Sequence, residues 1–223
     1  MTMLGGKVQR GPLPQFICAS YGFRRLWEDL GEYRSWNTKN CREPNEREFA
    51  RAVDEVELTS STHKVKPSLL VSCMAFHDPD KDSRHLGTNP RNMRAVASDP
   101  HFRHIAGRVS AFLKESRWPQ QPGQVVMLLF WCRSGNHRSV SCCELIYYCM
   151  QRAGFSVAMP DHLARPHWWV KCGNRGPCLQ CDPKRLPNTR WEQQNRAALE
   201  FAFEVYRDVG GPFVETSACP VLG

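Results

Sequence analysis

The chain has 223 residues, of which 41% are hydrophobic and 23% are charged, as in an ordinary globular protein. No apolar stretch approaches the roughly 18 residues of a membrane span. The first residues also lack the apolar core of a secretory signal, so we expect a cytoplasmic protein with no membrane partner. The net charge of +8 permits an acidic partner, either RNA or a phosphorylated metabolite, although the basic residues are scattered.

Residues 1–60 are expected to form an N-terminal arm followed by helices. The first 20 residues are rich in glycine, proline and polar residues, which is typical of a loose arm. A short helix is expected over residues 23–33. The next helix has stronger signals, because Asn45 and Glu48 match a capping box and apolar residues follow at helical spacing: Phe49, Ala52, Val53 and Val56.

Residues 61–211 are expected to form one α/β domain, followed by a tail over residues 212–223. In chain order we expect a strand over 69–76, a helix from Asp99-Pro100, a buried strand over 124–131, a helix from 137 or 138 to 152, a strand over 155–159 and a helix from Thr189 to Gly210. This alternation predicts a mostly parallel sheet with flanking helices, and a Cys-rich loop insertion over 160–187 precedes the last helix. Ligands of such sheets bind beyond the carboxyl ends of the strands, where loops 77–92, 132–139 and 160–167 are expected to meet.

The loop between the second strand and its helix has the residue types of an anion site. Its sequence from Cys132 to Ser139 is CRSGNHRS. The N–H groups of a tight loop entering a helix, together with the partial positive charge of the helix N-terminus, attract a phosphate. Gly135 allows the turn, Arg138 can bind two oxyanion oxygens, and Ser134 and Ser139 offer hydroxyl donors. The same field favours a thiolate at Cys132.

Two known families share this pattern, and the first is the cysteine-dependent protein phosphatases. The pattern Cys-x-x-Gly-x-x-Arg-Ser resembles their phosphate loop, although Trp131 stands where those enzymes usually have histidine. The resemblance implies that Cys132 is a nucleophile and that Arg138 stabilises the transition state. It also implies a general acid from a neighbouring loop, for which the candidates are Asp78, Asp80 and Asp82.

The second resemblance is longer. The string from Gly135 to Val140, with Asp82-Ser83-Arg84 and Asn89-Pro90 after the earlier strand, resembles the C-terminal domain of RapZ-type RNase adapter proteins. It covers about residues 65–165 and leaves out that family's kinase-like domain. The resemblance implies an α/β domain that binds a phosphorylated small molecule, which is an amino-sugar phosphate in the bacterial proteins. The implied ligand-binding residues are Asp82, Arg84, Cys132, Arg133, Ser134, Gly135, Asn136, His137, Arg138, Ser139 and His162.

The eleven cysteines indicate metal binding or thiol chemistry, because their number is odd and no secretory signal accompanies them. Cys178 and Cys181 have the spacing of a zinc knuckle, and Cys172 lies shortly before them. His167, or alternatively His162, is the expected fourth ligand. A closed site of this kind would hold a structural zinc, with no cofactor for catalysis. Free thiols and a disulfide or redox pair remain alternatives.

The first hypothesis for function is therefore a binding module. A strand–loop–helix phosphate cradle would bind a sugar phosphate or a nucleotide, and the chain would act as a sensor or adapter. The alternative is an enzyme, a phosphatase that uses Cys132 and Arg138. RNA or protein partners are a third expectation, based on charge and on the RapZ resemblance.

Overall fold

The computed structural model describes residues 15–24, 26, 44–55, 65–77, 85–115, 125–170, 172, 177–182, 184 and 189–214. The strands are β1 (Gln15–Gly22), β2 (Pro67–Ser72), β3 (Val125–Cys132) and β4 (Val157–His162). The helices are α2 (Glu46–Glu55), α3 (Pro90–Ser98), α4 (Pro100–Glu115), α5 (Arg138–Arg152) and α6 (Thr189–Asp208), with a 3-10 helix, η3 (Arg165–Val170). No helix in these ranges is both long and apolar enough to cross a bilayer.

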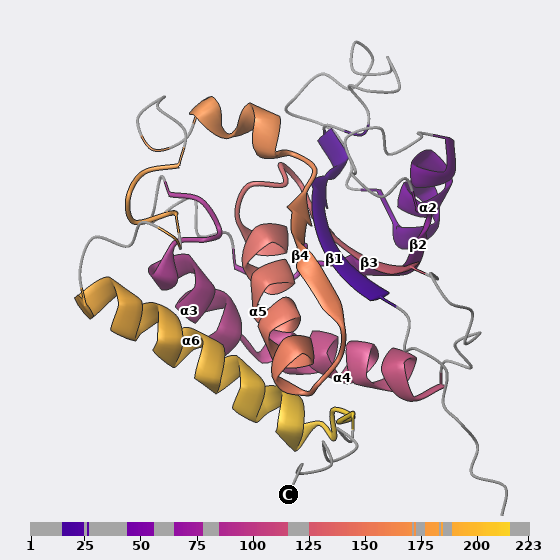
Figure 1. The fold of residues 1–223 in the computed structure, drawn as a ribbon. Helices are drawn as coiled ribbons and strands as arrows, with labels where there is room; N and C mark the ends of the chain where they lie inside the picture. Colours follow the sequence, from indigo (N-terminus) through magenta and orange to yellow (C-terminus); the bar gives the residue numbers. More distant parts are fainter. Residues whose placement is uncertain are drawn as a thin grey trace, which may run out of the picture.

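The strands form one parallel sheet in the order β2-β3-β1-β4 (Figure 1), which confirms the α/β fold expected from the sequence. The expectation of a loose arm over the first 20 residues is wrong for β1. This strand pairs with β3 from Gln15 opposite Val125 to Gly22 opposite Cys132, and every residue after Gln15 is buried. The described parts of residues 1–60 and 61–211 therefore share one sheet.

The structure agrees with the signals for α2 and adds a helix, α3, that the sequence analysis did not expect. The capping box that starts α2 is present, because Asn45 N–H donates to Glu48 Oε2 (2.8 Å) and Glu48 N–H donates to Asn45 Oδ1 (3.0 Å). The region expected as a loop over 77–92 ends earlier, because α3 begins at Pro90 behind the N-cap Asn89. In the described parts of the chain between β2 and β3 there are thus two helices. The helix expected over 23–33 lies mostly outside the described residues.

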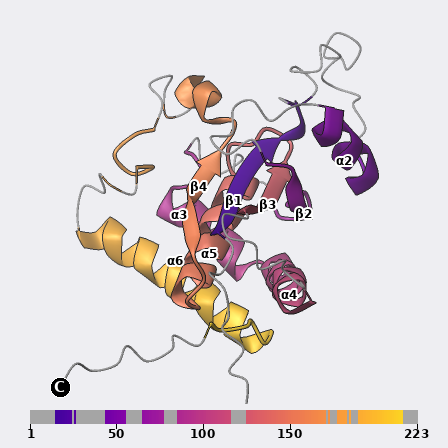
Figure 2. The ribbon, with the colours of Figure 1, turned by 45° about the vertical axis from the view of Figure 1, so that its right-hand side comes forward.

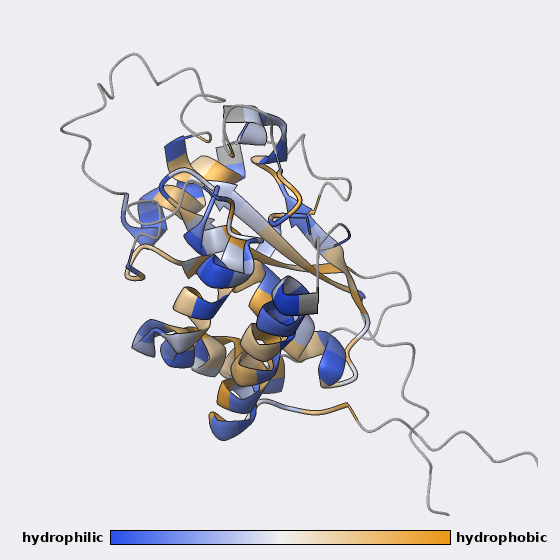
Figure 3. Ribbon diagram, turned by 90° about the vertical axis from the view of Figure 1, so that its left-hand side faces the viewer, coloured by the Kyte–Doolittle hydropathy of each residue, from blue (hydrophilic) through white to orange (hydrophobic). Residues whose placement is uncertain are grey.

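The helices cover the two faces of the sheet unequally (Figure 2). α2 packs on one face, where Phe49 stacks on Trp131 of β3 with ring centroids 4.3 Å apart. α3, α4 and α5 pack on the other face, and α6 lies across them. Figure 3 shows hydrophobic and hydrophilic residues on the same helices, as expected for helices with one face on a core and one in water.

This arrangement creates a switch point between β1 and β3. The two strands are neighbours, yet the chain continues from β1 to α2 on one face and from β3 to α5 on the other. The loops that leave two such strands diverge, and the crevice between them is the usual ligand site of open parallel sheets. Residues 133–137, which connect β3 to α5, lie at this point.

Candidate functional site

The loop over residues 133–137 rests directly on the end of β1. Gly135 has a φ of +70°, and a Cβ at this position would lie 2.7 Å from the backbone nitrogen of Gly22. A Cβ at Gly22 would in turn lie 2.4 Å from the carbonyl carbon of Ser134. Both positions therefore require glycine, one for its conformation and both for the close approach of the two backbones.

Some carbonyl groups of this loop are engaged by neighbouring backbone, two from other segments and one within the first turn of α5. Three of them accept backbone hydrogen bonds: Arg133 from Arg24 N–H (3.1 Å), Asn136 from Gly87 N–H (2.8 Å) and His137 from Ser141 N–H (2.8 Å). The described peptide bonds are all trans. Because a planar trans peptide holds its C=O and its N–H on opposite sides, the N–H groups of Ser134, His137 and Arg138 point away from these contacts. This is the orientation that an anion cradle needs.

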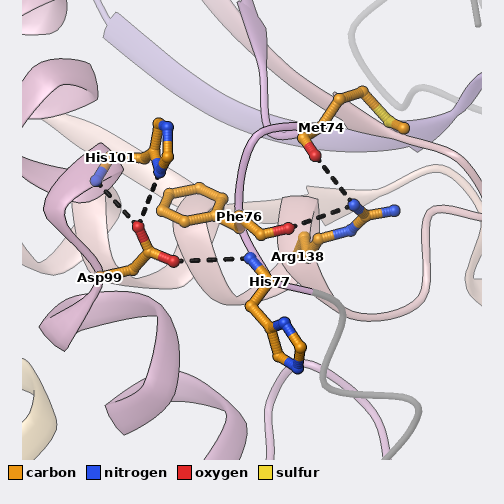
Figure 4. A network of polar contacts seen from close by, with 6 residues as sticks. All are labelled: Met74, Phe76, His77, Asp99, His101 and Arg138. Atoms are coloured by element: carbon orange, nitrogen blue, oxygen red, sulfur yellow. Dashed lines mark hydrogen bonds and ion pairs between the residues drawn. The ribbon is translucent and has the colours of Figure 1, made fainter.

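Arg138 is buried at the start of α5, with 7% of its surface exposed. Its Nη1 donates to the carbonyl oxygens of Met74 (3.0 Å) and Phe76 (3.3 Å), as Figure 4 shows. The guanidinium is therefore held in one orientation by the segment that follows β2. The same contacts fix residues 73–77 beside the loop after β3.

Asp99 holds the other side of that segment (Figure 4). Its carboxylate accepts hydrogen bonds from the N–H of His77 (3.4 Å), the N–H of His101 (2.9 Å) and the ring Nδ1 of His101 (2.8 Å). Burial alone would raise the pKa of this carboxyl, but the hydrogen bonds from His101 and His77 outweigh it and lower the pKa below its ordinary value. The ionised carboxylate of Asp99 therefore holds in place the segment that positions Arg138.

Cys132 ends β3 beneath the loop and is almost fully buried. Its Sγ lies 3.1 Å from Ser139 Oγ, and Ser139 Oγ donates to the carbonyl oxygen of Tyr21 at 3.3 Å. Cys132, Ser139 and the carbonyl of Tyr21 therefore form one chain of hydrogen bonds at the end of β3.

The other residues expected in the ligand site differ in accessibility. Arg133 and Ser134 are partly exposed, whereas Asn136 and His137 are buried. The Oδ1 atom of Asn136 has no hydrogen-bond partner within the described part of the chain. The remaining expected residues lie outside the described residues: Asp78, Asp80, Asp82 and Arg84. The structure therefore brings the residues from Cys132 to Ser139 together and leaves the acidic candidates undescribed.

His162 has both ring nitrogens engaged inside the fold. Its Nδ1 lies 2.8 Å from Ser20 Oγ, and its Nε2 lies 2.9 Å from Glu144 Oε1. The ring also lies beside Trp168, with centroids 5.1 Å apart. These contacts join β1, β4 and α5, so the structure gives His162 a role in packing the sheet against α5.

A second cluster lies where the Cys-rich segment meets the start of α3 (Figure 1). One ligand atom from each of His85, Cys172, Cys178 and Cys181 lies within 4.8 Å of the others, and this group could hold a metal ion. The three expected cysteines are present, but His85 stands in the group instead of His167. The expectation of His167 relied on its nearness in sequence, whereas His85 lies 87 residues before Cys172. No spacing motif could have found it.

The ligand atoms of this group lie close together. Sγ of Cys181 lies 3.5 Å from that of Cys172 and 3.6 Å from that of Cys178, and Nδ1 of His85 lies 3.8, 3.4 and 3.4 Å from the sulfurs of Cys172, Cys178 and Cys181. The sulfurs are far beyond the about 2.05 Å of a disulfide bond. Burial and the neighbouring Cys172 and Cys178 raise the pKa of the Cys181 thiol. Three thiolates can be gathered here only around a cation.

Backbone and side-chain contacts surround the four ligands. Thr88 Oγ1 donates to the carbonyl oxygen of Cys181, and Asn89 Nδ2 donates to Cys181 Sγ at 3.9 Å. An N–H donor to a ligand sulfur stabilises thiolate charge. A small buried cluster lies against the group and is formed by Leu86, Val140, Trp168 and Cys181. It connects the cysteines to α5.

Comparisons of the chain with protein-family models, with curated proteins and with solved structures found no match. The interpretation of both clusters therefore rests on their own residues and geometry.

Proposed function

We propose that the chain binds a phosphorylated small molecule, either a sugar phosphate or a nucleotide, on the loop from Arg133 to Ser139, and acts as a sensor or adapter module. The observation that carries this proposal is the orientation of the loop, whose carbonyls bond to the protein while the N–H groups of Ser134, His137 and Arg138 face the other way. The loop also leads into α5, whose N-cap His137 provides no side-chain cap. The N-terminus of a helix attracts a phosphate through its partial positive charge.

The charge at this edge of the sheet supports the proposal. Arginines follow three of the parallel strands: Arg24 after β1, Arg133 after β3 and Arg165 after β4. Parallel strands end at one edge, so these residues gather at the edge where the loop lies. Arg138 adds a buried guanidinium whose orientation is fixed by Met74 and Phe76. A dianionic phosphate complements this concentration of positive charge.

The experiment is a titration of the purified protein with inorganic phosphate, a hexosamine phosphate and a nucleoside monophosphate by calorimetry. Arg133→Ala removes a partly exposed guanidinium, and we expect affinity to fall about tenfold or more, the effect of one charge-assisted hydrogen bond. Arg138→Lys keeps the charge but loses the planar fork, and we expect a similar loss. The matched control is Arg207→Ala, an exposed arginine in the last turn of α6. Equal affinity in all three variants would overturn the proposal.

The phosphatase alternative has one observation in its favour, the 3.1 Å contact between Cys132 Sγ and Ser139 Oγ beside Arg138. The near-complete burial of Cys132 and its place in a chain of hydrogen bonds with Ser139 and Tyr21 favour a structural role instead. Hydrolysis of an aryl phosphate by the wild-type protein and by Cys132→Ser separates the two. We expect no turnover that depends on Cys132. Turnover abolished by the substitution would establish the enzyme.

We also propose that the group of His85, Cys172, Cys178 and Cys181 binds a structural zinc. Zinc bonds of about 2.3 Å to sulfur and about 2.0 Å to nitrogen, at tetrahedral angles, place two sulfurs about 3.8 Å apart and a sulfur and a nitrogen about 3.5 Å apart. Five of the six separations lie between 3.4 and 3.8 Å, and the sixth, between Cys172 and Cys178, is no longer than 4.8 Å. Three sulfurs and one imidazole leave no open position on a tetrahedral ion, so the metal would stabilise structure. Elemental analysis should find one zinc per chain, and a metal-free protein would refute this.

A further inference from the structure

We infer that the metal centre sets the shape of the phosphate loop, so that ligand binding depends on the bound metal. This inference rests on the function proposed for the loop and adds that the bound metal regulates it. The connection is the segment over residues 85–89, here called the clamp segment. It begins with a metal ligand, His85, and its next residues lie against the loop.

One side of the clamp segment is fixed to the metal group. His85 contributes Nδ1 to the group itself. Thr88 donates to the carbonyl oxygen of Cys181, and Asn89 donates to its sulfur at 3.9 Å. Three of the five residues of the clamp segment therefore belong to the metal-binding group or contact it, and a bound ion would fix this segment relative to the Cys-rich segment.

The other side of the clamp segment is fixed to the loop and to α5. Gly87 N–H donates to the carbonyl oxygen of Asn136 at 2.8 Å, and Ser141 Oγ donates to the carbonyl oxygen of Gly87 at 2.7 Å. The backbones are so close that a Cβ at Gly87 would lie 2.2 Å from the carbonyl oxygen of His137. The hydrogen bond from Gly87 fixes the carbonyl of Asn136, and thereby the opposite orientation of the His137 N–H on which the proposed anion cradle depends.

The metal is the main support of the Cys-rich side of this connection. Among the described residues, the buried cluster that includes Cys181 consists of Leu86, Val140 and Trp168 besides it, with the partly buried Cys172 and Cys178 packed against it. Such a small cluster cannot order a loop without a metal or another cross-link. The two large cores contain none of the four metal ligands, so the sheet and its helices remain folded when the ion is removed. Asn92 still holds the carbonyls of His85 (3.1 Å) and Leu86 (2.8 Å), so the clamp segment loosens on one side only.

The test compares the wild-type protein with Cys178→Ser, which removes one ligand, and with His167→Ala. The second variant is the matched control, because it removes an imidazole of the same region that lies outside the group. Zinc content, hydrogen exchange of each segment, and affinity for inorganic phosphate and a hexosamine phosphate are measured for each protein. The wild-type protein is measured with zinc, after chelation, and after zinc is returned.

We expect chelation and Cys178→Ser to increase exchange in residues 85–89 and 133–141, while amides of β1, β3 and α6 stay protected. If the ordered loop falls to about a tenth of the molecules, apparent affinity falls about tenfold. Returned zinc should restore both readouts in the wild-type protein, and His167→Ala should match the wild type. Unchanged exchange in 133–141 when the Cys-rich segment loosens would overturn the inference, as would a protein that binds no metal. A zinc-loaded protein that binds no phosphate would refute the proposed function instead. The two outcomes can be distinguished because hydrogen exchange measures the effect of the metal on the loop in the absence of phosphate.

Discussion

Gly87→Ala is the sharpest test of the contact between the clamp segment and the phosphate loop. The new Cβ would lie 2.2 Å from His137 O, 2.6 Å from Val140 Cβ and 2.7 Å from Ser141 N, against an ordinary contact distance of 3.4 Å or more. Relief requires a shift of about 1.2 Å, because 3.4 minus 2.2 is 1.2. Two of the three obstructing atoms are backbone atoms, so no side-chain rotation relieves them.

A shift of this size breaks the hydrogen bonds that Gly87 makes with Asn136 and Ser141, which are 2.8 and 2.7 Å long. Overpacking costs about 1–3 kcal/mol, and two neutral hydrogen bonds add about 1–3 kcal/mol together. The free energy of unfolding should therefore fall by about 2–6 kcal/mol, within the roughly 5–15 kcal/mol of a typical domain.

The assay is urea unfolding of the zinc-loaded protein, followed by tryptophan fluorescence. The control is Gly107→Ala in α4, where an added Cβ meets nothing within 4 Å. That change should stabilise the helix by about 0.5–1 kcal/mol. A Gly87→Ala protein within about 0.5 kcal/mol of the wild type, the range of an ordinary surface substitution, would refute the close packing of these segments. Phosphate affinity of the folded Gly87→Ala protein should also fall.

Three further changes test other parts of the structure. The pKa of the Asp99 carboxyl is lowered in the fold, so the ionised carboxylate stabilises the protein above its unfolded pKa of about 3.9, and this stabilisation is lost as the pH falls through the lower folded pKa. The urea midpoint of Asp99→Asn should therefore decrease less on acidification than that of the wild type. Equal decreases in the two proteins would contradict this. His162→Phe removes the partner of the buried Ser20 and of the half-buried Glu144 and should cost about 2–4 kcal/mol in urea unfolding, with zinc content unchanged. A His162→Phe protein of normal stability that no longer binds phosphate would place His162 in the ligand site. Asn45→Ala breaks the capping box of α2 and should cost about 0.5–2 kcal/mol in the same assay, whereas an unchanged midpoint would show that the cap contributes nothing.

Features fixed by local chemistry could be predicted from the sequence. The apolar run before Cys132 becomes a strand buried on both faces, and α5 ends before Gly154, which has a φ of +88°. Asn45 and Glu48 form their capping box because both partners lie within one helical turn. The loop from Cys132 to Ser139 is a continuous stretch of chain between these elements, so its position follows from theirs.

β1 was missed because its local signal is weak. The strand has the sequence QFICASYG, in which small residues dilute the β-branched and aromatic residues that indicate a strand. Its place is determined by burial between β3 and β4, which is a tertiary effect. The start of α3 was missed for a related reason: Asn89 and Pro90 carry a cap and a first-turn proline, but they lie inside a long polar stretch.

His85 could not be predicted because metal ligands need only meet in space. Cys178 and Cys181 lie on one tight turn, in which Cys181 N–H donates to the carbonyl oxygen of Cys178 at 2.9 Å, and such a pair has a recognisable spacing. The fourth ligand comes from the segment before α3, and its approach depends on the packing of Leu86 against Val140 and Trp168. Nearness along the chain favoured His167, which lies in η3 and outside the group.

The loop to which we propose that phosphate binds is held by several contacts, and three of them differ in how they respond to change. On one side Gly135 lies against Gly22, which belongs to a central strand and moves only with the sheet. On another, Arg138 is bound to the carbonyls of Met74 and Phe76, in a segment that Asp99 also fixes. The third contact, Gly87, belongs to a segment that begins at His85, a member of the group that could hold a metal ion. Since the first two depend on the folded sheet and helices, the contact at Gly87 is the one that a change in metal content can alter while the protein remains folded. That is why hydrogen exchange in 133–141 is the readout that distinguishes control of the loop from general loss of stability.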